Sequence, residues 1–272
     1  MASPNIYPAG IGGSSGDALT TSGTIYTSGQ IWYVSSVGGT DAASPRGLDR
    51  NTPLATLAQA VTNASAGDTI VFLANHVQAI TAEQAISKAL TIVSEGSSST
   101  RARLTAGLAG AGTMMTVTAP VTFGNIYFPA TTGAGTTNNR VGLAAGSAGS
   151  VVRGCYFEAG AADAASAIHI TSNNVTIEDT TFVVTAAAAS PQRGIGLAGA
   201  VSDLRIKDCT FNASTFGWGS QYGLDLGAGA VTRLYGENVQ MLNGSDATLA
   251  SGSTGILNVT SPSGAVKVLW VA

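Results

Sequence analysis

The chain has 272 residues and a mass of 27.0 kDa, with a formal net charge of −3 and a pI of about 5.2. This balance lacks the basic surface by which proteins bind nucleic acid or anionic membranes, and no apolar run approaches the roughly 20 residues of a membrane span. We therefore expect no nucleic acid and no membrane among its partners. Only 10% of the residues are charged, against roughly 25% in ordinary soluble domains. Such a bland surface predicts that another subunit covers part of it.

Residues 1–30 show no sustained periodicity and are rich in Gly, Ser, Thr and Ala. The first five residues have no basic region leading into an apolar segment, so no secretory signal is visible. Small apolar islands interrupt the polar residues, and a purely flexible tail would not need them. We interpret the segment as an attachment arm that becomes ordered on a partner; the alternative is a terminus that folds along its own solenoid or stays disordered. The candidate attachment residues are Ile6, Tyr7, Pro8 and Ile11.

Residues 31–68 are predicted to form a module of a strand and a short helix. Residues 31–34 have the composition of a strand, and a loop rich in Gly, Asp and Pro follows them. Thr52 and Pro53 then supply an N-cap and a first-turn proline. Apolar residues at helical spacing continue to about residue 64. Because a solenoid needs its open end covered, we expect this helix to lie over the first coil.

Two short phrases recur through the second half of the chain. The first ends in phenylalanine at Phe128, Phe157, Phe182 and Phe211, at intervals of 29, 25 and 29 residues. The second is a pair of apolar residues around one intervening residue, and it keeps the same period. Alternating apolar residues indicate strands with one buried face, and a fixed period of this size is typical of a solenoid. The sequence thus predicts an all-β parallel β-helix of about seven coils over residues 69–260, with a C-terminal capping strand in residues 261–272.

Four segments of the chain resemble a known family. They are residues 33–34 (YV), 38–41 (GGTD), 53–61 (PLATLAQAV) and 67–70 (GDTI). Together they are similar to the N-terminal module of right-handed, single-stranded parallel β-helix proteins of the pectin-lyase-like type. That family includes polysaccharide lyases and hydrolases, phage tailspikes and tailspike-like virion proteins. The resemblance covers roughly residues 31–260 and implies the fold much more strongly than any activity.

Two aspartates are the best candidates for catalytic carboxylates. Asp179 and Asp208 occupy the same phrase position in adjacent coils, and a glycosidase needs two carboxyl groups about 5–9.5 Å apart. The position before them reads Arg153, Glu178 and Lys207, a row of alternating charge. We favour turn-forming aspartates beside a surface ion row over a catalytic dyad, so we predict no catalytic residue.

The histidines and cysteines predict neither a metal site nor a cofactor site. His76 and His169 lie in different coils, with His169 pointing outward, and neither has a partner at metal-ligand spacing. Cys155 and Cys209 occupy one phrase position two repeats apart, with Thr180 between them. Stacked strands are about 4.8 Å apart, so the two sulfurs are too distant for a disulfide. We expect two small buried residues.

One aromatic cluster suggests a contact surface. Phe216, Trp218 and Tyr222 lie in a loop of Gly, Ser and Gln residues. Exposed together, they suit either an inter-subunit contact or stacking on sugar rings, while the plainest reading is a loop folded over its own coil. We favour packing or subunit contact, because no cluster of carboxylates or amides surrounds them.

These features favour a non-enzymatic structural protein of a phage virion. The expected molecule is a homotrimeric, tailspike-like post that decorates and stabilises a capsid, with the major capsid protein or another lattice subunit as partner. It would be assembled in the host cytoplasm and located in the virion. The alternatives are a polysaccharide lyase or glycoside hydrolase, with Asp179, Asp208 and Trp218 as its likeliest parts, and an adhesin that binds a surface glycan through the Trp218 loop.

Overall fold

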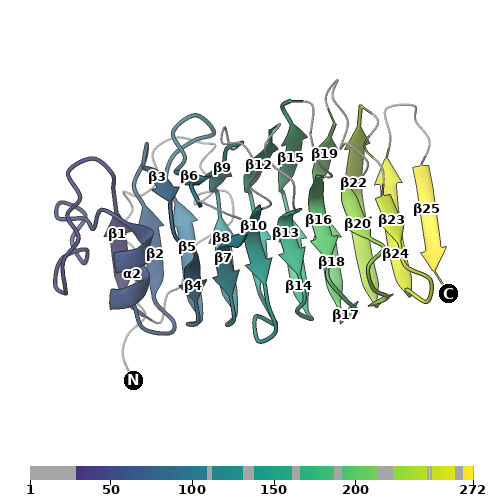
Figure 1. The fold of residues 1–272 in the computed structure, drawn as a ribbon, viewed down its shortest axis with the longest axis horizontal. Coiled ribbons are helices and arrows are strands. Elements are labelled where there is room, and N and C mark those ends of the chain that lie inside the picture. The colour runs from purple at the N-terminus through teal and green to yellow at the C-terminus, as the bar shows by residue number, and fades with distance from the viewer. Residues whose placement is uncertain are drawn as a thin grey trace.

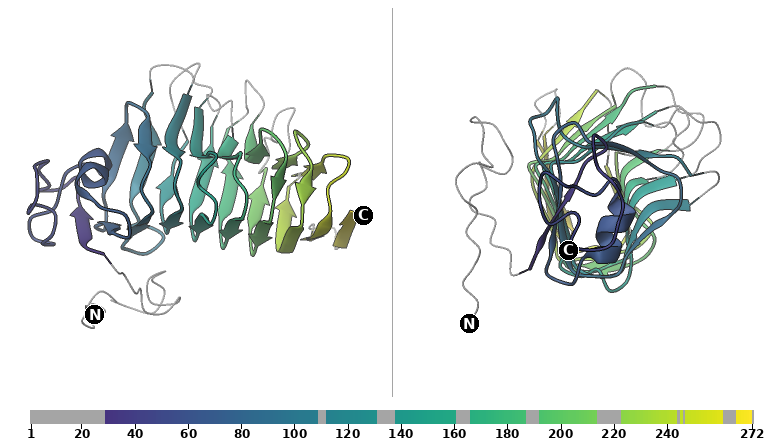
Figure 2. Two further views of the ribbon diagram at one scale, coloured as in Figure 1. Left: turned by 90° about the horizontal axis from the view of Figure 1, so that it is seen from below. Right: turned by 90° about the vertical axis from the view of Figure 1, so that its left-hand side faces the viewer.

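The computed structural model describes residues 29–108, 112–130, 138–160, 166–186, 192–213, 223–243, 245, 247–260 and 266–271. Over these residues the chain forms one elongated parallel β-helix, whose coils stack along the long axis (Figure 1). Viewed from its N-terminal end, the strands of each coil run around a common interior (Figure 2). The predicted fold class is confirmed. Among the described residues, no helix has the length and apolar character needed to cross a membrane.

Three faces run along the stack, and we name them A, B and C. Face A is a parallel ladder that begins at the N-terminal end of the molecule and continues to the C-terminal end. Its strands, in spatial order, are β1 (Ile31–Val34), β2 (Thr69–Phe72), β5 (Leu90–Ser94), β8 (Val121–Gly124), β11 (Val151–Arg153), β14 (Val175–Glu178), β18 (Leu204–Lys207), β22 (Leu234–Leu242) and β24 (Gly255–Thr260).

Face B follows face A within each coil after a one-residue or short corner. The long strand β22 crosses this corner and belongs to both faces, which therefore form one 16-stranded sheet. The other strands of face B are β3 (Val77–Ile80), β6 (Arg103–Ala106), β9 (Tyr127–Phe128), β12 (Tyr156–Ala159), β15 (Thr181–Val184) and β19 (Thr210–Asn212).

Face C closes each coil and forms a separate seven-stranded sheet. Its strands are β4 (Gln84–Ile86), β7 (Gly112–Val117), β10 (Asn138–Leu143), β13 (Ser166–Ile170), β16 (Arg193–Leu197), β20 (Leu224–Leu226) and β23 (Ala247–Leu249). A small two-stranded sheet of β17 (Val201–Ser202) and β21 (Val231–Thr232) lies between faces C and A in the chain. Counted as complete turns, the solenoid has about five, slightly fewer than the seven expected.

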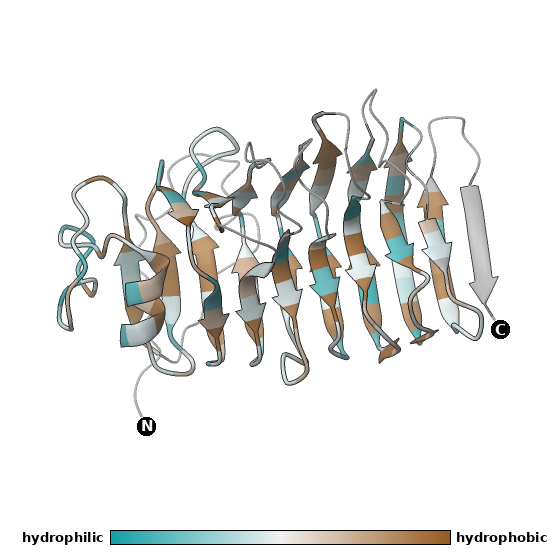
Figure 3. Ribbon diagram, viewed as in Figure 1, coloured by the Kyte–Doolittle hydropathy of each residue, from teal (hydrophilic) through white to brown (hydrophobic). Residues whose placement is uncertain are grey.

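The interior of the solenoid is filled by rows of identical or similar apolar side chains. The predicted phenylalanine row is confirmed: Phe128, Phe157, Phe182 and Phe211 face inward from face B and are at most 1% exposed. Their rings stack nearly parallel, with successive centroids 4.4, 5.3 and 4.7 Å apart. Such pairs contribute roughly 0.5–1.5 kcal/mol each beyond simple burial. Figure 3 shows the apolar segments recurring along the strands of successive coils.

The helix at the N-terminal end begins later than the sequence predicts. Helix α2 spans Leu57–Asn63, and its N-cap is Thr56, whose hydroxyl accepts the N–H of Gln59 (3.3 Å). The prediction of Thr52 as N-cap and Pro53 as first helical residue is wrong. Leu54 instead forms a parallel bridge with Val34, so residues 53–55 are held extended along β1. The helix still covers the interior, because its buried side chains pack on the core.

The C-terminal end carries the predicted strand. Strand β25 (Val266–Val271) pairs antiparallel with β24 and is the last strand of the stack (Figure 1). The cysteines also lie as expected: Cys155 and Cys209 are buried and free. Thr180 separates them, since the strand residues that follow these three positions pair in successive coils.

Candidate functional site

The corner between faces A and B holds the two aspartates that were weighed as a catalytic dyad. Asp179 and Asp208 occupy this corner in adjacent coils, with left-handed backbone conformations (φ 49° and 51°). The N–H of Asp179 donates to the carbonyl of Lys207 (3.1 Å), and that of Asp208 donates to the carbonyl of Glu237 (3.0 Å). Asp, Asn and Gly adopt this conformation most readily. The equivalent corners hold other residues of these types, Asn125, Gly154 and Asn238.

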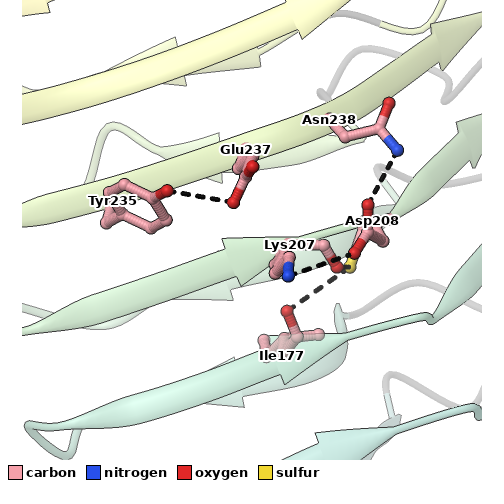
Figure 4. Close-up of polar contacts among 7 residues, drawn as sticks. Ile177, Lys207, Asp208, Tyr235, Glu237 and Asn238 are labelled. Atoms are coloured by element: carbon pink, nitrogen blue, oxygen red, sulfur yellow. Dashed lines mark hydrogen bonds and ion pairs between the residues drawn. The ribbon is translucent and has the colours of Figure 1, made fainter.

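Figure 4 shows the polar contacts around Asp208 at this corner. Asn238 Nδ2 donates to Asp208 Oδ1 (2.7 Å), and Lys207 Nζ lies 3.7 Å from Asp208 Oδ2. Both carboxylate oxygens of Asp208 thus face side chains of the same corner, and the left-handed backbone of this residue turns the chain from face A to face B. The contacts of Asp208 therefore favour the turn-forming role over the acid–base role.

A row of alternating charge runs along the outer side of face A beside this corner. The strand register aligns Arg153, Glu178, Lys207 and Glu237 in successive coils. The predicted row is thereby confirmed and gains Glu237, which also accepts a hydrogen bond from the Tyr235 hydroxyl (2.9 Å, Figure 4). Opposite charges on neighbouring strands contribute roughly 0.2–1 kcal/mol per pair, and like charges destabilise. The row therefore helps the coils to stack in one register.

Face C carries a second polar surface, centred on His169. This residue lies on β13 between Gly142 of β10 and Gly196 of β16, and Asp225 of β20 continues the row. The flanking glycines place no side chain beside the imidazole. A Cβ added to Gly196 would lie 2.4 Å from the Ser166 hydroxyl oxygen. The surface beside His169 is thus formed by peptide backbone, with neighbouring side chains lying over it.

Two of these neighbouring side chains come from the first outward position of their strands. Arg193 Nε donates to Asp225 Oδ2 (2.5 Å), and its Cδ lies 2.9 Å from the position that a Cβ on Gly196 would take. Ser166 is 2% exposed, and within the described part of the chain its hydroxyl has no hydrogen-bond partner. Buried hydroxyl groups usually have a hydrogen-bond partner, so this buried oxygen is an exception within the described residues.

The electrostatics of face C suit hydrogen bonding rather than metal binding. Burial, and then the positive charge of Arg193, lower the pKa of His169. Its imidazole is therefore neutral near pH 7 and offers one donor and one acceptor. The negative charge of Asp225 is paired with the guanidinium of Arg193. No group of three His, Cys, Asp or Glu residues that could hold a metal ion occurs in the described ranges. The arrangement can orient a polar, uncharged ligand along the face.

The candidate contact residues from the sequence fall outside the described residues. They are the arm residues Ile6, Tyr7, Pro8 and Ile11 and the aromatic residues Phe216, Trp218 and Tyr222. In the chain, residues 214–222 lead directly into β20, the strand that carries Asp225.

The sequence analysis placed His169 on the outer side of its strand but did not connect it with Asp225. The structure brings them into one row, because the residue between the two apolar members of the second phrase occupies the same outward position in every coil. Aligning that position alone, to give Gly142, His169, Gly196 and Asp225, is the signal that would have found the surface. Arg193 was not considered, since it stands outside the phrase.

No protein-family model matches this chain, and no curated protein sequence matches it. The structure itself defines the class of protein, a parallel β-helix, and is consistent with the pectin-lyase-like type that residues 33–70 resemble. Within that class a fold hosts many functions, so activity must be argued from the surfaces.

Proposed function

We propose that this chain is a non-enzymatic structural protein of a phage virion. In this proposal three copies form a tailspike-like post that decorates and stabilises a capsid, and residues 1–30 attach it to the major capsid protein or another lattice subunit. Three arms on one trimer bind a lattice by multivalency, and a symmetric lattice with three-fold sites is the natural partner of a trimer. The post is located in the virion.

The proposal is supported by the roles that the inward and outward positions of the repeated strands have in every coil. Inward positions stack the four phenylalanines, and outward positions of face A alternate in charge. The corner aspartates form turns. Residues that an enzyme would devote to chemistry serve here to hold one coil on the next, as a rigid rod requires.

The test is attachment of the purified protein to particles that lack it. The full chain should co-sediment with the particles, while a variant without residues 1–30 should stay in the supernatant with an unchanged circular dichroism spectrum. A Lys207→Glu variant is the matched control, because it alters the solenoid surface and leaves the arm intact, and it should still bind. Undiminished binding of the shortened chain would rule out attachment through the arm.

A second candidate function is supported by face C. A neutral imidazole and the Arg193–Asp225 pair form a hydrogen-bonding surface on face C. Such a surface suits a glycan, either bound by an adhesin or cleaved by a polysaccharide lyase or hydrolase. Release of reducing ends from a capsular polysaccharide would identify an enzyme. Glycan binding that is lost in Trp218→Ala, without turnover, would identify an adhesin.

A further inference from the structure

Two arginine side chains lie beside the same corner between faces A and B, in the N-terminal half of the solenoid. Arg101 comes from the loop between β5 and β6, and its Nη1 donates to the carbonyl of Gly154, two coils further on (3.2 Å). Arg153 ends β11, and its Nε lies 4.0 Å from the position that a Cβ on Gly124 would take. Arg101 thus spans the coil of Gly124, and Arg153 extends back over it.

Glycine occupies the two backbone positions that adjoin these side chains. Gly124 pairs with Arg153 in the register of face A, at the outward position of the coil before it. Gly154 stands at the corner where other coils have Asn or Asp. Neither glycine adds a side chain between the two guanidinium groups. Both arginines are partly exposed, so a ligand from solvent can reach them.

No carboxylate of the described residues forms an ion pair with Arg101 or Arg153. Glu178 is aligned with Arg153 in the next coil without forming such a pair. On face B, burial and then a hydrogen bond to Glu158 raise the pKa of Tyr127, so Glu158 is engaged by that hydroxyl. The two guanidinium groups therefore differ from the arginines that do pair with a carboxylate, which are Arg50, Arg193 and Arg233.

Arg101 is partly withdrawn from water although it has no anion beside it. Its Nε is buried and has no hydrogen-bond partner among the described residues. Burial lowers the pKa of Arg101, and Cys155 and Tyr156 oppose this effect. A guanidinium stays protonated in proteins, so the corner holds a partly desolvated positive charge. An oxyanion bound to its remaining N–H groups would stabilise that charge.

We propose that Arg101 and Arg153 form a binding site for a phosphate group at this corner. Planar guanidinium groups present forked N–H donors that match the geometry of phosphate oxygens, and two of them offset most of the charge of one phosphate group. The ligand is either the free ion or a phosphate substituent of a larger molecule, such as a phosphorylated glycan. Two arginines are too few for a nucleic acid, whose binding engages several phosphates at once. The site depends neither on the proposed trimer nor on residues 1–30.

Isothermal titration calorimetry of the full chain with inorganic phosphate tests the site, with chloride keeping the ionic strength constant. The wild type should bind one phosphate per chain. Arg101→Gln and Arg153→Gln should each weaken binding about tenfold or more, because each removes charge-assisted hydrogen bonds. Arg205→Gln is the matched control, since it removes the same charge from the outward row of face A beside Tyr235, and it should bind as the wild type does. A wild type without saturable binding, or equal losses in all three variants, would overturn the inference.

A second substitution of Arg101 separates loss of the site from loss of the fold. Arg101→Lys keeps the charge but not the fork, so it should bind phosphate more weakly than the wild type with an unchanged circular dichroism spectrum. Should both Arg101 variants fail to fold, Arg153→Gln decides, because Arg153 is partly exposed at the end of its strand. Undiminished binding by folded Arg153→Gln would then refute the site.

Glucose 1-phosphate and glucose distinguish the two sources of the phosphate group. Tighter binding of the sugar phosphate than of inorganic phosphate would identify a site for a phosphorylated glycan. Binding of the sugar phosphate that is no tighter would identify a site for the free ion. Binding of glucose as strong as that of its phosphate would contradict the role of the two arginines.

Discussion

Acidification from about pH 7.5 to about pH 4 should destabilise this protein through one buried side chain, His76. The residue is 0% exposed and stacks on Phe72, with ring centroids 4.8 Å apart. Its Nε2 lies 3.3 Å from Gln78 Oε1, which also accepts the N–H of Leu57 at the start of α2 (3.0 Å). Within the described residues His76 Nδ1 has no hydrogen-bond partner. A proton added at Nδ1 would place a charge in this interior without an acceptor.

The magnitude follows from the difference between the folded and unfolded pKa values. Burial, partly opposed by the hydrogen bond to Gln78, lowers the pKa of His76 from 6.5 to about 4. The unfolded chain therefore binds this proton before the folded one does. The part of the free energy of unfolding that depends on a neutral His76 is fully present above about pH 6.5. It is lost progressively as the pH falls toward 4. At about 1.36 kcal/mol per pKa unit, the loss amounts to about 3 kcal/mol.

Urea denaturation of the wild type and of His76→Gln at several pH values in this window measures the loss. Carboxylates titrate alike in both proteins, so the difference between their free energies of unfolding should shrink by about 3 kcal/mol as the pH falls. His169→Gln is the matched control, because His169 is only partly buried on the outer face, and it should leave most of the pH dependence in place. Parallel curves for wild type and His76→Gln would refute the reasoning.

Three further predictions concern the packing of the coils. Phe182→Ala removes a middle ring of the phenylalanine stack and should cost about 3–5 kcal/mol in urea denaturation; a loss below about 1 kcal/mol would show that the rings do not carry the stack. Asp208→Ala should cost about 1 kcal/mol in thermal unfolding and Asp208→Gly less, since glycine adopts φ near 51° without strain, and a more damaging glycine would contradict the turn-forming role. Burial raises the pKa of the Cys155 and Cys209 thiols to about 12, so neither should react with a thiol reagent at pH 8 until the protein unfolds; rapid reaction of the native protein would show that this interior opens.

The sequence predicts well wherever a residue has the same task in every coil. The phenylalanine row, the outward His169 and the turn-forming Asp179 and Asp208 all follow from the repeat, because one packing environment recurs along the stack. The start of α2 could not be found in this way. Thr52 and Pro53 form a sound capping signal locally, but pairing with β1 keeps the following residues extended, and tertiary contact overrides propensity.

The polar surface of face C was missed for a different reason. Its members come from three strands that are joined by connections of unequal length, and their meeting depends on register. Register on face C is set by the buried apolar pairs on either side of each outward residue. A glycine in that outward row has no evident role when one repeat is read alone. In the stacked coils, Gly196 leaves room for the side chains of Ser166 and Arg193.

The most direct test of the structural role is quantitative mass spectrometry of phage particles purified from the host that produces this chain. If the protein is a trimeric post on a symmetric capsid, it will be present in the particles at a copy number that is a multiple of three. The count will fall to background when residues 1–30 are deleted. Purified particles that lack the chain, while the surrounding medium contains it together with cleaved polysaccharide, would contradict the structural role and favour the enzyme.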